Sequence, residues 1–501
     1  MAQPTPSWHG DIPAQLDENV RLLMETFNKC SDFVLRQFHI PRLGKNAAAA
    51  FIDGLVNHEA IMQSAIQPLL RFPHTDIVSG ISDLEAVGQR MLISSETSVA
   101  TGADEALDKM LHGDTLILID GMPGVIILNV RGWDRRSITE PQTETVVRGP
   151  REGFTETLRT NTSLIRRRIA SSDLRMELVQ VGERSHTNIC IAYLEGLAKP
   201  ELVEEARTRL SSINMDFPSS SGMIAELIKD SPYSLFDTIG YTEKPDVIAA
   251  QLMEGRVAVI VDGTPFVLTI PMMFVENFQT SEDYLIGPIY ATFLRSIRLL
   301  SFFISFLAPA LYVALTVYHQ ELIPTTLLFT MIAAAEGLPF PAAVEMALML
   351  VIFEILKEAG IRLPKPVGQA VSIVGALVMG QAAIQAGLVG APVVIVVALT
   401  GVASFAVPML SNAMTLLRWY TLVLAAVMGG YGVMLGIMTT FVHIASLQSF
   451  GIHHLSPISP LTKSDLKDSV VRVPLWKMRA RPSALHPVDR IRIRNEKPRW
   501  R

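Results

Sequence analysis

The sequence predicts an α/β cytoplasmic region of two related (duplicated) subdomains, followed by an α-helical polytopic membrane domain. Three observations predict this fold class: residues 297–447 form a long apolar block, the region before it contains an internal repeat, and charge divides the chain into three parts. Residues 1–296 carry 26 Lys and Arg against 39 Asp and Glu, residues 297–450 carry 5 against 5, and residues 451–501 carry 12 against 4. This division is typical of a soluble region fused to a membrane region.

The same shifts in composition predict the segments of the chain. These are a helical lead (1–30), a first α/β subdomain (31–134), a basic linker and helix (135–172), a second α/β subdomain (173–276), a juxtamembrane connector (277–296), a helical transmembrane domain (297–447) and a basic tail (448–501). The N-terminus lacks a basic stretch followed by an apolar one, so we expect no secretory signal and a cytoplasmic first region. The proline-rich, basic tail is expected to be cytoplasmic, disordered and attracted to anionic lipid headgroups.

The internal repeat has an offset of 142 residues. Residues 51–55 correspond to 193–197, and residues 111–123 correspond to 253–265. Asp120-Gly121 and Asp262-Gly263 lie between runs of β-branched residues, so each subdomain is expected to close on a β-hairpin; glycine adopts the positive φ of a tight turn without steric cost. We expect each aspartate to bond its own turn rather than to serve catalysis or metal binding.

The linker, residues 135–172, holds eight arginines against four glutamates. Phe154, Leu158, Ile165 and Ile169 recur at helical spacing, and positive charge at the end of such a helix suits its dipole. Two interpretations stay open: a solvated helix that joins the subdomains, or a contact surface for a neighbouring subunit or an anionic ligand. The subunit-contact candidates are Arg148, Arg151, Arg166, Arg167 and Arg168. Nucleic-acid binding is not expected, because the domain is acidic and the basic cluster lacks interleaved aromatic residues.

The soluble region shows no pattern of an enzyme or a metal site. It lacks a phosphate-binding Gly-Lys-Ser/Thr loop, paired metal-binding cysteines or histidines, and a Gly-x-Ser-x-Gly turn. Cys30 and Cys190 are the only cysteines, and we expect both to be ordinary core residues. We therefore expect no catalytic residues, no metal and no cofactor.

The apolar block begins with residues 297–319, which as a helix would be roughly 35 Å long, enough for a hydrocarbon core of about 30 Å. The following stretch is interrupted by prolines and carries Glu336, Glu345 and Glu354. Acidic residues at membrane depth are costly unless they lie inside protein or line water, so these three are candidates for an ion pathway. The alternative is that Glu354 marks the interfacial end of a helix.

The span over residues 368–388 has a face of small residues. Gly368, Ser372, Ala376 and Gly380 recur every four residues, and such a face lets another helix approach closely. The span is either the centre of a bundle or, in a symmetric oligomer, the wall of a pore. The pore-lining candidates are Gln369, Ser372, Ala376, Gly380 and Gln381.

The apolar segments number five, with 391–408 and 418–447 as the last two. Five is odd, whereas a cytoplasmic first region and a basic tail on the same side need an even number of crossings. We expect the broken stretch 322–359 to be the re-entrant or doubled element.

Several long runs together resemble one known family, the A subunits of the spore germinant receptors (GerA family), over roughly residues 20–460. The runs are Ser137-Ile-Thr-Glu-Pro-Gln-Thr-Glu144, Val147-Arg-Gly-Pro-Arg-Glu-Gly-Phe-Thr-Glu156, Asn161-Thr-Ser-Leu-Ile-Arg-Arg-Arg168, Leu338-Pro-Phe-Pro341, Phe353-Glu354, Glu358-Ala-Gly-Ile-Arg-Leu-Pro364 and residues 368–387. The arginine-rich end beyond about residue 475 lies outside the resemblance.

The resemblance implies a non-enzymatic, multi-pass subunit of the spore inner membrane that works with a B and a C subunit. It also implies that the complex senses a small-molecule nutrient and that copies of the A subunit form a homo-oligomer around an ion channel, which triggers germination. The alternatives are a secondary transporter that uses Glu336 or Glu345, and a membrane-anchored enzyme. The transporter predicts an internal repeat within the membrane block, and none is found.

Overall fold

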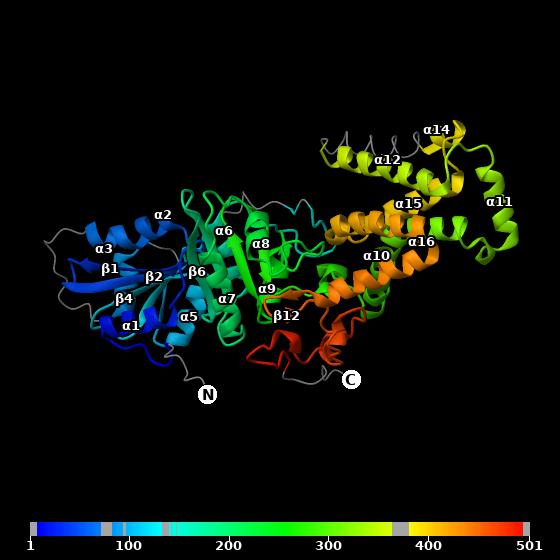
Figure 1. The fold of residues 1–501 in the computed structure, drawn as a ribbon. Helices are drawn as coiled ribbons and strands as arrows, with labels where there is room; N and C mark the ends of the chain where they lie inside the picture. The colour runs from blue at the N-terminus through cyan, green and yellow to red at the C-terminus, as the bar shows by residue number, and fades with distance from the viewer. Residues whose placement is uncertain are drawn as a thin grey trace. The chain divides into compact units, whose positions relative to one another are not determined.

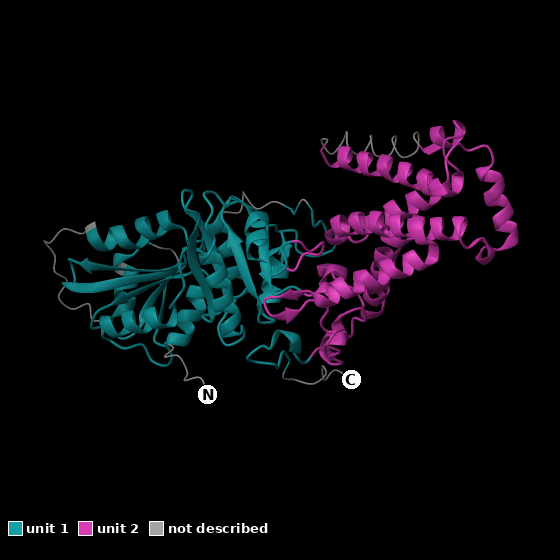
Figure 2. Cartoon of the chain, in the orientation of Figure 1, with its two compact units in different colours: residues 1–232, 239–272, 479–501 teal, residues 233–238, 273–478 magenta. Residues whose placement is uncertain are grey.

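The computed structural model describes residues 8–71, 83–93, 97–132, 140–141, 143–146, 148–362 and 380–493. The chain forms two compact units, coloured separately in Figure 2. Unit 1 comprises residues 1–232, 239–272 and 479–501, and unit 2 comprises residues 233–238 and 273–478. Unit 1 contains two five-stranded sheets, and unit 2 is mainly helical (Figure 1).

The first sheet of unit 1 has the order β1-β2-β4-β5-β3, and all neighbouring strands are antiparallel. Its elements are α1 (Leu16–Thr26), β1 (Phe33–Ile40), β2 (Lys45–Ile52), α2 (His58–Ile61), a π-helical turn (Met62–Ile66), α3 (Gln67–Arg71), α4 (Leu84–Met91), β3 (Thr97–Ala100), α5 (Ala103–Leu111), β4 (Thr115–Ile119) and β5 (Val125–Leu128). Alternate residues of β2 face two cores: Ala48 packs with α1 and α5, and Ala49 packs with α2 to α4. The sheet is therefore covered on both faces.

The second sheet has the corresponding order, β6-β7-β9-β10-β8. Its elements are α6 (Leu158–Arg168), β6 (Leu174–Val181), β7 (Thr187–Leu194), α7 (Pro200–Ser211), α8 (Ser221–Ile228), β8 (Gly240–Thr242), α9 (Pro245–Leu252), β9 (Val257–Val261) and β10 (Val267–Ile270). Ile165 of α6 and Leu252 of α9 pack against Cys190 and Ile260 on one face of the sheet. Burial raises the pKa of the Cys190 thiol, which suits a core residue rather than a reactive one.

The two predicted hairpins are confirmed. β4 pairs with β5 and β9 pairs with β10, and the turn glycines Gly121 and Gly263 have φ of 71° and 86°. The turn aspartates bond more distant groups than expected: Asp120 accepts the Leu16 N–H at 3.2 Å, and Asp262 accepts the Leu158 N–H at 3.0 Å. Each aspartate therefore fixes the first residue of a helix far away in the sequence.

The helices α1 and α6 begin at Leu16 and Leu158, which again differ by 142 residues. Leu23 of α1 lies in the core of the first sheet, and Ile165 of α6 lies in the core of the second. Both helices thus belong to the packing of their subdomains, although the predicted boundaries, 31–134 and 173–276, exclude them.

Unit 2 begins with 3-10 turns (Phe274–Phe278, Ser281–Tyr284) and continues through apolar helices. These are α10 (Pro288–Val317), α11 (Thr325–Ala335), α12 (Ala342–Arg362), α14 (Gly380–Gln385), α15 (Ala391–Phe405) and α16 (Ser411–Ser446). Among the described residues, two helices are long and apolar enough to cross a membrane, Pro288–Val317 and Pro408–Ser446.

The helix α16 folds back on itself at Gly429, where φ is 59° and ψ is −136°. The hydroxyls of Tyr420 and Thr439 lie 3.0 Å apart, although 19 residues of straight helix would separate them by roughly 28 Å. A Cβ at Gly432 would lie 2.0 Å from the carbonyl oxygen of Leu424, so the returning leg approaches the first leg more closely than a side chain permits. Small residues thus allow the close approach of two antiparallel legs.

This fold-back corrects the prediction of a single long span over residues 418–447. The stretch 322–359, predicted to be re-entrant or doubled, forms two helices, α11 and α12, and how it crosses the membrane stays a prediction. The segment predicted as one long span, 418–447, is the one that reverses, because Gly429 adopts a left-handed φ.

The described part of the tail, residues 448–493, is packed rather than disordered. It contains β11 (Gln448–Ser449), β12 (Ile452–His453) and 3-10 turns (Asp465–Asp468, Leu475–Lys477, Ser483–Leu485). In unit 1, the Val488 N–H donates to the Leu197 carbonyl at 3.1 Å, and Arg481 Nε donates to the Met253 carbonyl at 2.8 Å. An arginine of the basic tail, Arg481, thus bonds backbone oxygens instead of being fully solvated.

Candidate functional site in the helical unit

Pro309 lies inside α10, and a buried arginine of α16 bonds the backbone carbonyl that this proline leaves without a helical partner. Proline has no N–H, so the carbonyl of Ser305, four residues earlier, loses its helical partner. Arg418 Nε donates to that carbonyl oxygen at 2.8 Å, and the Arg418 side chain is wholly buried. The Thr421 hydroxyl donates to the next carbonyl, that of Phe306, at 2.8 Å. Two side chains of α16 thus satisfy the backbone groups that the proline disturbs.

The charge of Arg418 is balanced by Glu354 of α12. Arg418 Nη1 lies 2.8 Å from Glu354 Oε1, and Arg418 Nη2 has no hydrogen-bond partner among the described residues. Lys357 lies 3.7 Å from the other oxygen of Glu354 and donates to the Ser411 hydroxyl at 2.9 Å. These contacts join α10, α12 and α16 through charged groups inside an apolar bundle, where an unpaired charge is costly.

The other two predicted ion-pathway glutamates have different surroundings. Glu345 is buried, and its Oε2 accepts the N–H of Gly390, the residue before α15, at 2.9 Å. A carboxylate at the start of a helix is stabilised by the helix dipole. Glu336, at the end of α11, is exposed. In the structure, Glu345 accepts a backbone hydrogen bond and Glu354 forms ion pairs within the helical unit. The assignment of the three glutamates to an ion pathway stays a prediction.

The predicted pore-lining set is only partly described. Gln369, Ser372 and Ala376 lie outside the described residues. Gly380 is buried at the start of α14, where a Cβ would lie 3.3 Å from Val394 Cγ1, and Gln381 is exposed. Gly380 therefore packs against α15, and the pore assignment stays a prediction.

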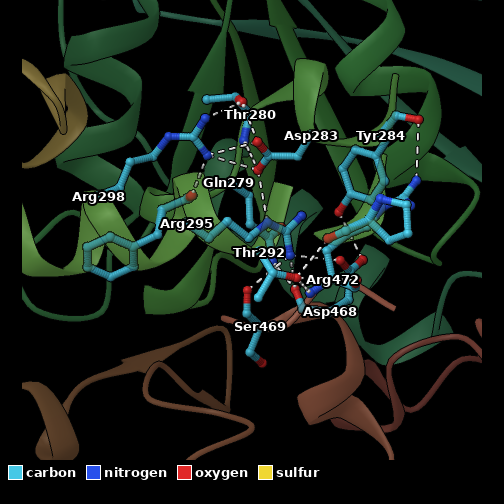
Figure 3. Close-up of polar contacts among 12 residues, drawn as sticks. Gln279, Thr280, Asp283, Tyr284, Thr292, Arg295, Arg298, Asp468, Ser469 and Arg472 are labelled. Atoms are coloured by element: carbon cyan, nitrogen blue, oxygen red, sulfur yellow. Dashed lines mark hydrogen bonds and ion pairs between the residues drawn. The ribbon is translucent and has the colours of Figure 1, made fainter. Parts of the chain in front are cut away.

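A second buried charge cluster lies at the start of α10 (Figure 3). The Asp283 side chain is wholly buried and accepts from Arg295 Nε at 2.9 Å, from Arg298 Nη1 at 2.9 Å and from the Thr280 hydroxyl at 3.1 Å. Arg295 is also wholly buried. The cluster ties the 3-10 turns before α10 to its second and third turns.

The tail completes this cluster. Arg295 Nη1 donates to Asp468 Oδ1 at 2.9 Å and to the Ser469 carbonyl at 3.0 Å, and the Tyr284 hydroxyl donates to Asp468 Oδ2 at 2.9 Å. The Arg472 N–H donates to the Thr292 hydroxyl at 3.0 Å. Figure 3 shows these side chains converging on the backbone of residues 468–472. The segment that leads into α10 and the tail are thereby held together.

The predicted subunit-contact arginines are divided between the interior and the surface of unit 1. Arg166 is wholly buried and forms an ion pair with Asp32 at 2.8 Å, so it links the two subdomains and has no surface to offer a second subunit. Arg167 and Arg168 both pair with Glu152, at 3.5 and 2.9 Å. Arg151 pairs with Glu140 at 3.6 Å, and Arg148 is exposed. For these four residues, a subunit contact stays a prediction.

Neither arginine site was predictable from the sequence. Signals were present: Pro309 interrupts an apolar segment, and Arg418 is one of the few charged residues within the block. Their pairing was not visible, because Ser305 and Arg418 are 113 residues apart. Among the described residues, no group of three or more His, Cys, Asp or Glu side chains could hold a metal ion.

These features define a membrane-associated protein in which an α/β region precedes apolar helices with charged groups inside. The chain belongs to the GerA family: residues 21–484 match the family described as Bacillus/Clostridium GerA spore germination protein. The resemblance inferred from the quoted runs is thereby confirmed.

Named relatives cover nearly the whole chain. It is 42% identical over 484 residues to spore germination protein KA of Bacillus subtilis, and this match covers 96% of this chain and 88% of that protein. It is also 42% identical over 473 residues to the membrane protein YfkQ of Bacillus subtilis, covering 94% of this chain and 91% of that protein. Among solved structures, the N-terminal domain of the A subunit of the Bacillus megaterium spore germinant receptor GerK3 is 29% identical, with a TM-score of 0.42, and 53% of this chain and 98% of that chain are covered.

Proposed function

We propose that this protein is a membrane subunit of a nutrient-responsive spore germinant receptor, and that copies of it assemble into an ion channel whose opening triggers germination. The family match and relatives named as spore germination proteins support the receptor role over a secondary transporter or an enzyme. B and C subunits of the receptor are its proposed partners, in the inner membrane of the spore.

The observation that carries the membrane assignment is the inverted polarity of unit 2. Its charged side chains Arg418 and Glu345 lie inside, whereas many of its large apolar side chains are exposed. The helix α11 contains no buried residue, and Leu327, Phe329 and Ile332 are exposed. Such surfaces need lipid or further protein to cover them.

We infer that the helical unit crosses the membrane an even number of times. The legs of α16, residues 411–428 and 430–446, would each be roughly 26 Å long, close to the hydrocarbon thickness. Tyr318, at the end of α10, donates to the Ala426 carbonyl near the turn at 2.7 Å. Ser305, nearer the start of α10, contacts Met414 at the open end of the hairpin. Both ends of α16 then lie on the side where α10 begins, which suits a cytoplasmic first region and a cytoplasmic tail.

We also infer that the two α/β subdomains arose by duplication. Support comes from the common strand order and from the bonds of Asp120 to Leu16 and of Asp262 to Leu158, each pair shifted by 142 residues.

In the proposed mechanism, nutrient binding to the complex shifts the assembly between a closed and an open state. The helix α10 connects the charge cluster at its start with Pro309 and the Ser305 carbonyl that Arg418 bonds. A movement transmitted along α10 would therefore reach a turn whose carbonyls are bonded by side chains, and such bonds can exchange partners more readily than those of a regular helix.

Conductance recordings test this proposal. The purified chain, reconstituted with its B and C partners in planar bilayers, should show nutrient-dependent currents. Leucine at Ser372, Ala376 or Gln381 should change the conductance, whereas Ala445→Leu, on the exposed side of α16, should not. Absence of currents, or equal currents in all variants, would remove the channel assignment.

A further inference from the structure

We propose that residues 456–478, here called the C-terminal strap, form a docking surface for the anionic headgroups of lipids. The proposal rests on the membrane placement proposed above and adds the site on the chain where the leaflet is recognised. It differs from attraction of a disordered basic tail, because the strap is packed in unit 2.

The strap is held at the first turns of α10. Arg295 binds the Asp468 side chain and the carbonyls of Asp468 and Ser469 at 2.8 to 3.0 Å, and Thr292 bonds the Arg472 N–H. The helix α10 has 30 residues and is roughly 45 Å long, which exceeds the hydrocarbon core by about 15 Å. If its C-terminal part spans the core, its first turns lie in the headgroup layer, and so does the strap.

The strap exposes basic and apolar side chains together. Lys463, Lys467 and Lys477 are exposed. The exposed apolar side chains are Leu461, Val471, Leu475 and Trp476. The negative charge of Asp468 is already paired with Arg295, so three exposed lysines stand against the one remaining carboxylate of the strap, that of Asp465. The outward charge of the strap is therefore positive, which complements an anionic leaflet.

The same level of α10 has an apolar, aromatic face. Ile289, Tyr290 and Phe293 are 87%, 58% and 57% exposed, and the rings of Tyr290 and Phe293 are stacked with centroids 6.4 Å apart. Tyrosine and tryptophan concentrate at membrane interfaces, where one end of the side chain is apolar and the other is wet. The exposed face of the strap and the exposed face of the first turns of α10 therefore both have the composition of a membrane interface.

A lipid surface fits this composition better than a protein partner does. Lysine is depleted at the cores of protein interfaces, whereas lysine stems lie along apolar surface at a membrane while the ammonium reaches the headgroups. Lys477 Nζ lies 5.1 Å from the centroid of the Trp476 ring, which places a cation beside an amphipathic ring.

Fluorescence quenching in proteoliposomes of the full chain tests the proposal. Vesicles of phosphatidylcholine contain a minor fraction of brominated phosphatidylglycerol or, for comparison, the same fraction of brominated phosphatidylcholine. The contribution of Trp476 is the difference between the native chain and Trp476→Phe. We expect the brominated phosphatidylglycerol to quench this contribution several-fold more strongly.

Changing Lys463, Lys467 and Lys477 to Gln should abolish this preference, since each basic residue near the surface contributes roughly fivefold. The matched control changes Lys109, Lys199 and Lys229 of unit 1 to Gln and should leave the preference unchanged. Equal quenching by both lipids, or shielding of Trp476 from both lipids and from aqueous acrylamide, as under a protein partner, would overturn the proposal. Conductance of the same vesicles with the partner subunits reports on channel function separately.

Discussion

The hydrogen bond from Arg418 to the carbonyl that Pro309 leaves unpaired predicts an energetic coupling between these two residues. Arg418→Met removes the donor to the Ser305 carbonyl and leaves the partly exposed Glu354 with Lys357, 3.7 Å away, as its cation. The lost hydrogen bond to the backbone carbonyl accounts for about 1 kcal/mol of the destabilisation. Pro309→Ala restores an N–H four residues after Ser305, so this carbonyl regains a helical partner.

Arg418→Met should therefore cost about 1 kcal/mol less in the Pro309→Ala background than in the native chain. The assay is equilibrium unfolding of the detergent-solubilised chain, arranged as a double-mutant cycle. Pro392→Ala is the matched control, because Pro392 lies in the first turn of α15, where no helical N–H is needed, and it should show no coupling. Additive effects of Pro309→Ala and Arg418→Met, within about 0.5 kcal/mol, would refute the reasoning.

Three further predictions concern other buried contacts. Burial raises the pKa of Glu144 to about 7. Between pH 4.5 and 7 the folded state therefore binds more protons than the unfolded state. The free energy of unfolding should then fall as pH rises through this window, by up to about 3 kcal/mol. Glu144→Gln should flatten that dependence in unfolding measured across pH, and an unchanged slope would contradict the assignment. Gly432→Ala should separate the legs of α16 and destabilise the chain by about 1–3 kcal/mol. Gly287→Ala should be tolerated, because a Cβ at Gly287 has no neighbouring atom within 4 Å. Thermal unfolding of the two variants measures the difference. Asp283→Asn should cost about 3–5 kcal/mol, because it leaves Asp468 as the carboxylate of a cluster that contains both Arg295 and Arg298. Asp216→Asn, in an exposed pair with Arg184, should change the unfolding free energy by less than about 1 kcal/mol. Equal losses would speak against the cluster.

Local chemistry made part of the fold predictable. The turns at Gly121 and Gly263 and the helix that ends in three arginines were expected from turn residues and periodicity, because those signals lie within one short segment. The fold-back at Gly429 was not expected, since glycines in apolar helices are also common where helices simply pack closely. The left-handed φ of Gly429 and the contact of Tyr420 with Thr439 distinguish the two cases, and both are known only from the structure.

By itself, the sequence determined the family, the acidic character of the first region, the 142-residue repeat and the apolar helices, all of which follow from composition, spacing or matching runs of residues. Tertiary structure alone decided the partners of the buried charges: Arg166 with Asp32, Arg295 with Asp283 and the tail, and Arg418 with the Ser305 carbonyl. The physical reason is that a buried guanidinium must find acceptors wherever the fold brings them close, and separation along the chain does not limit that choice.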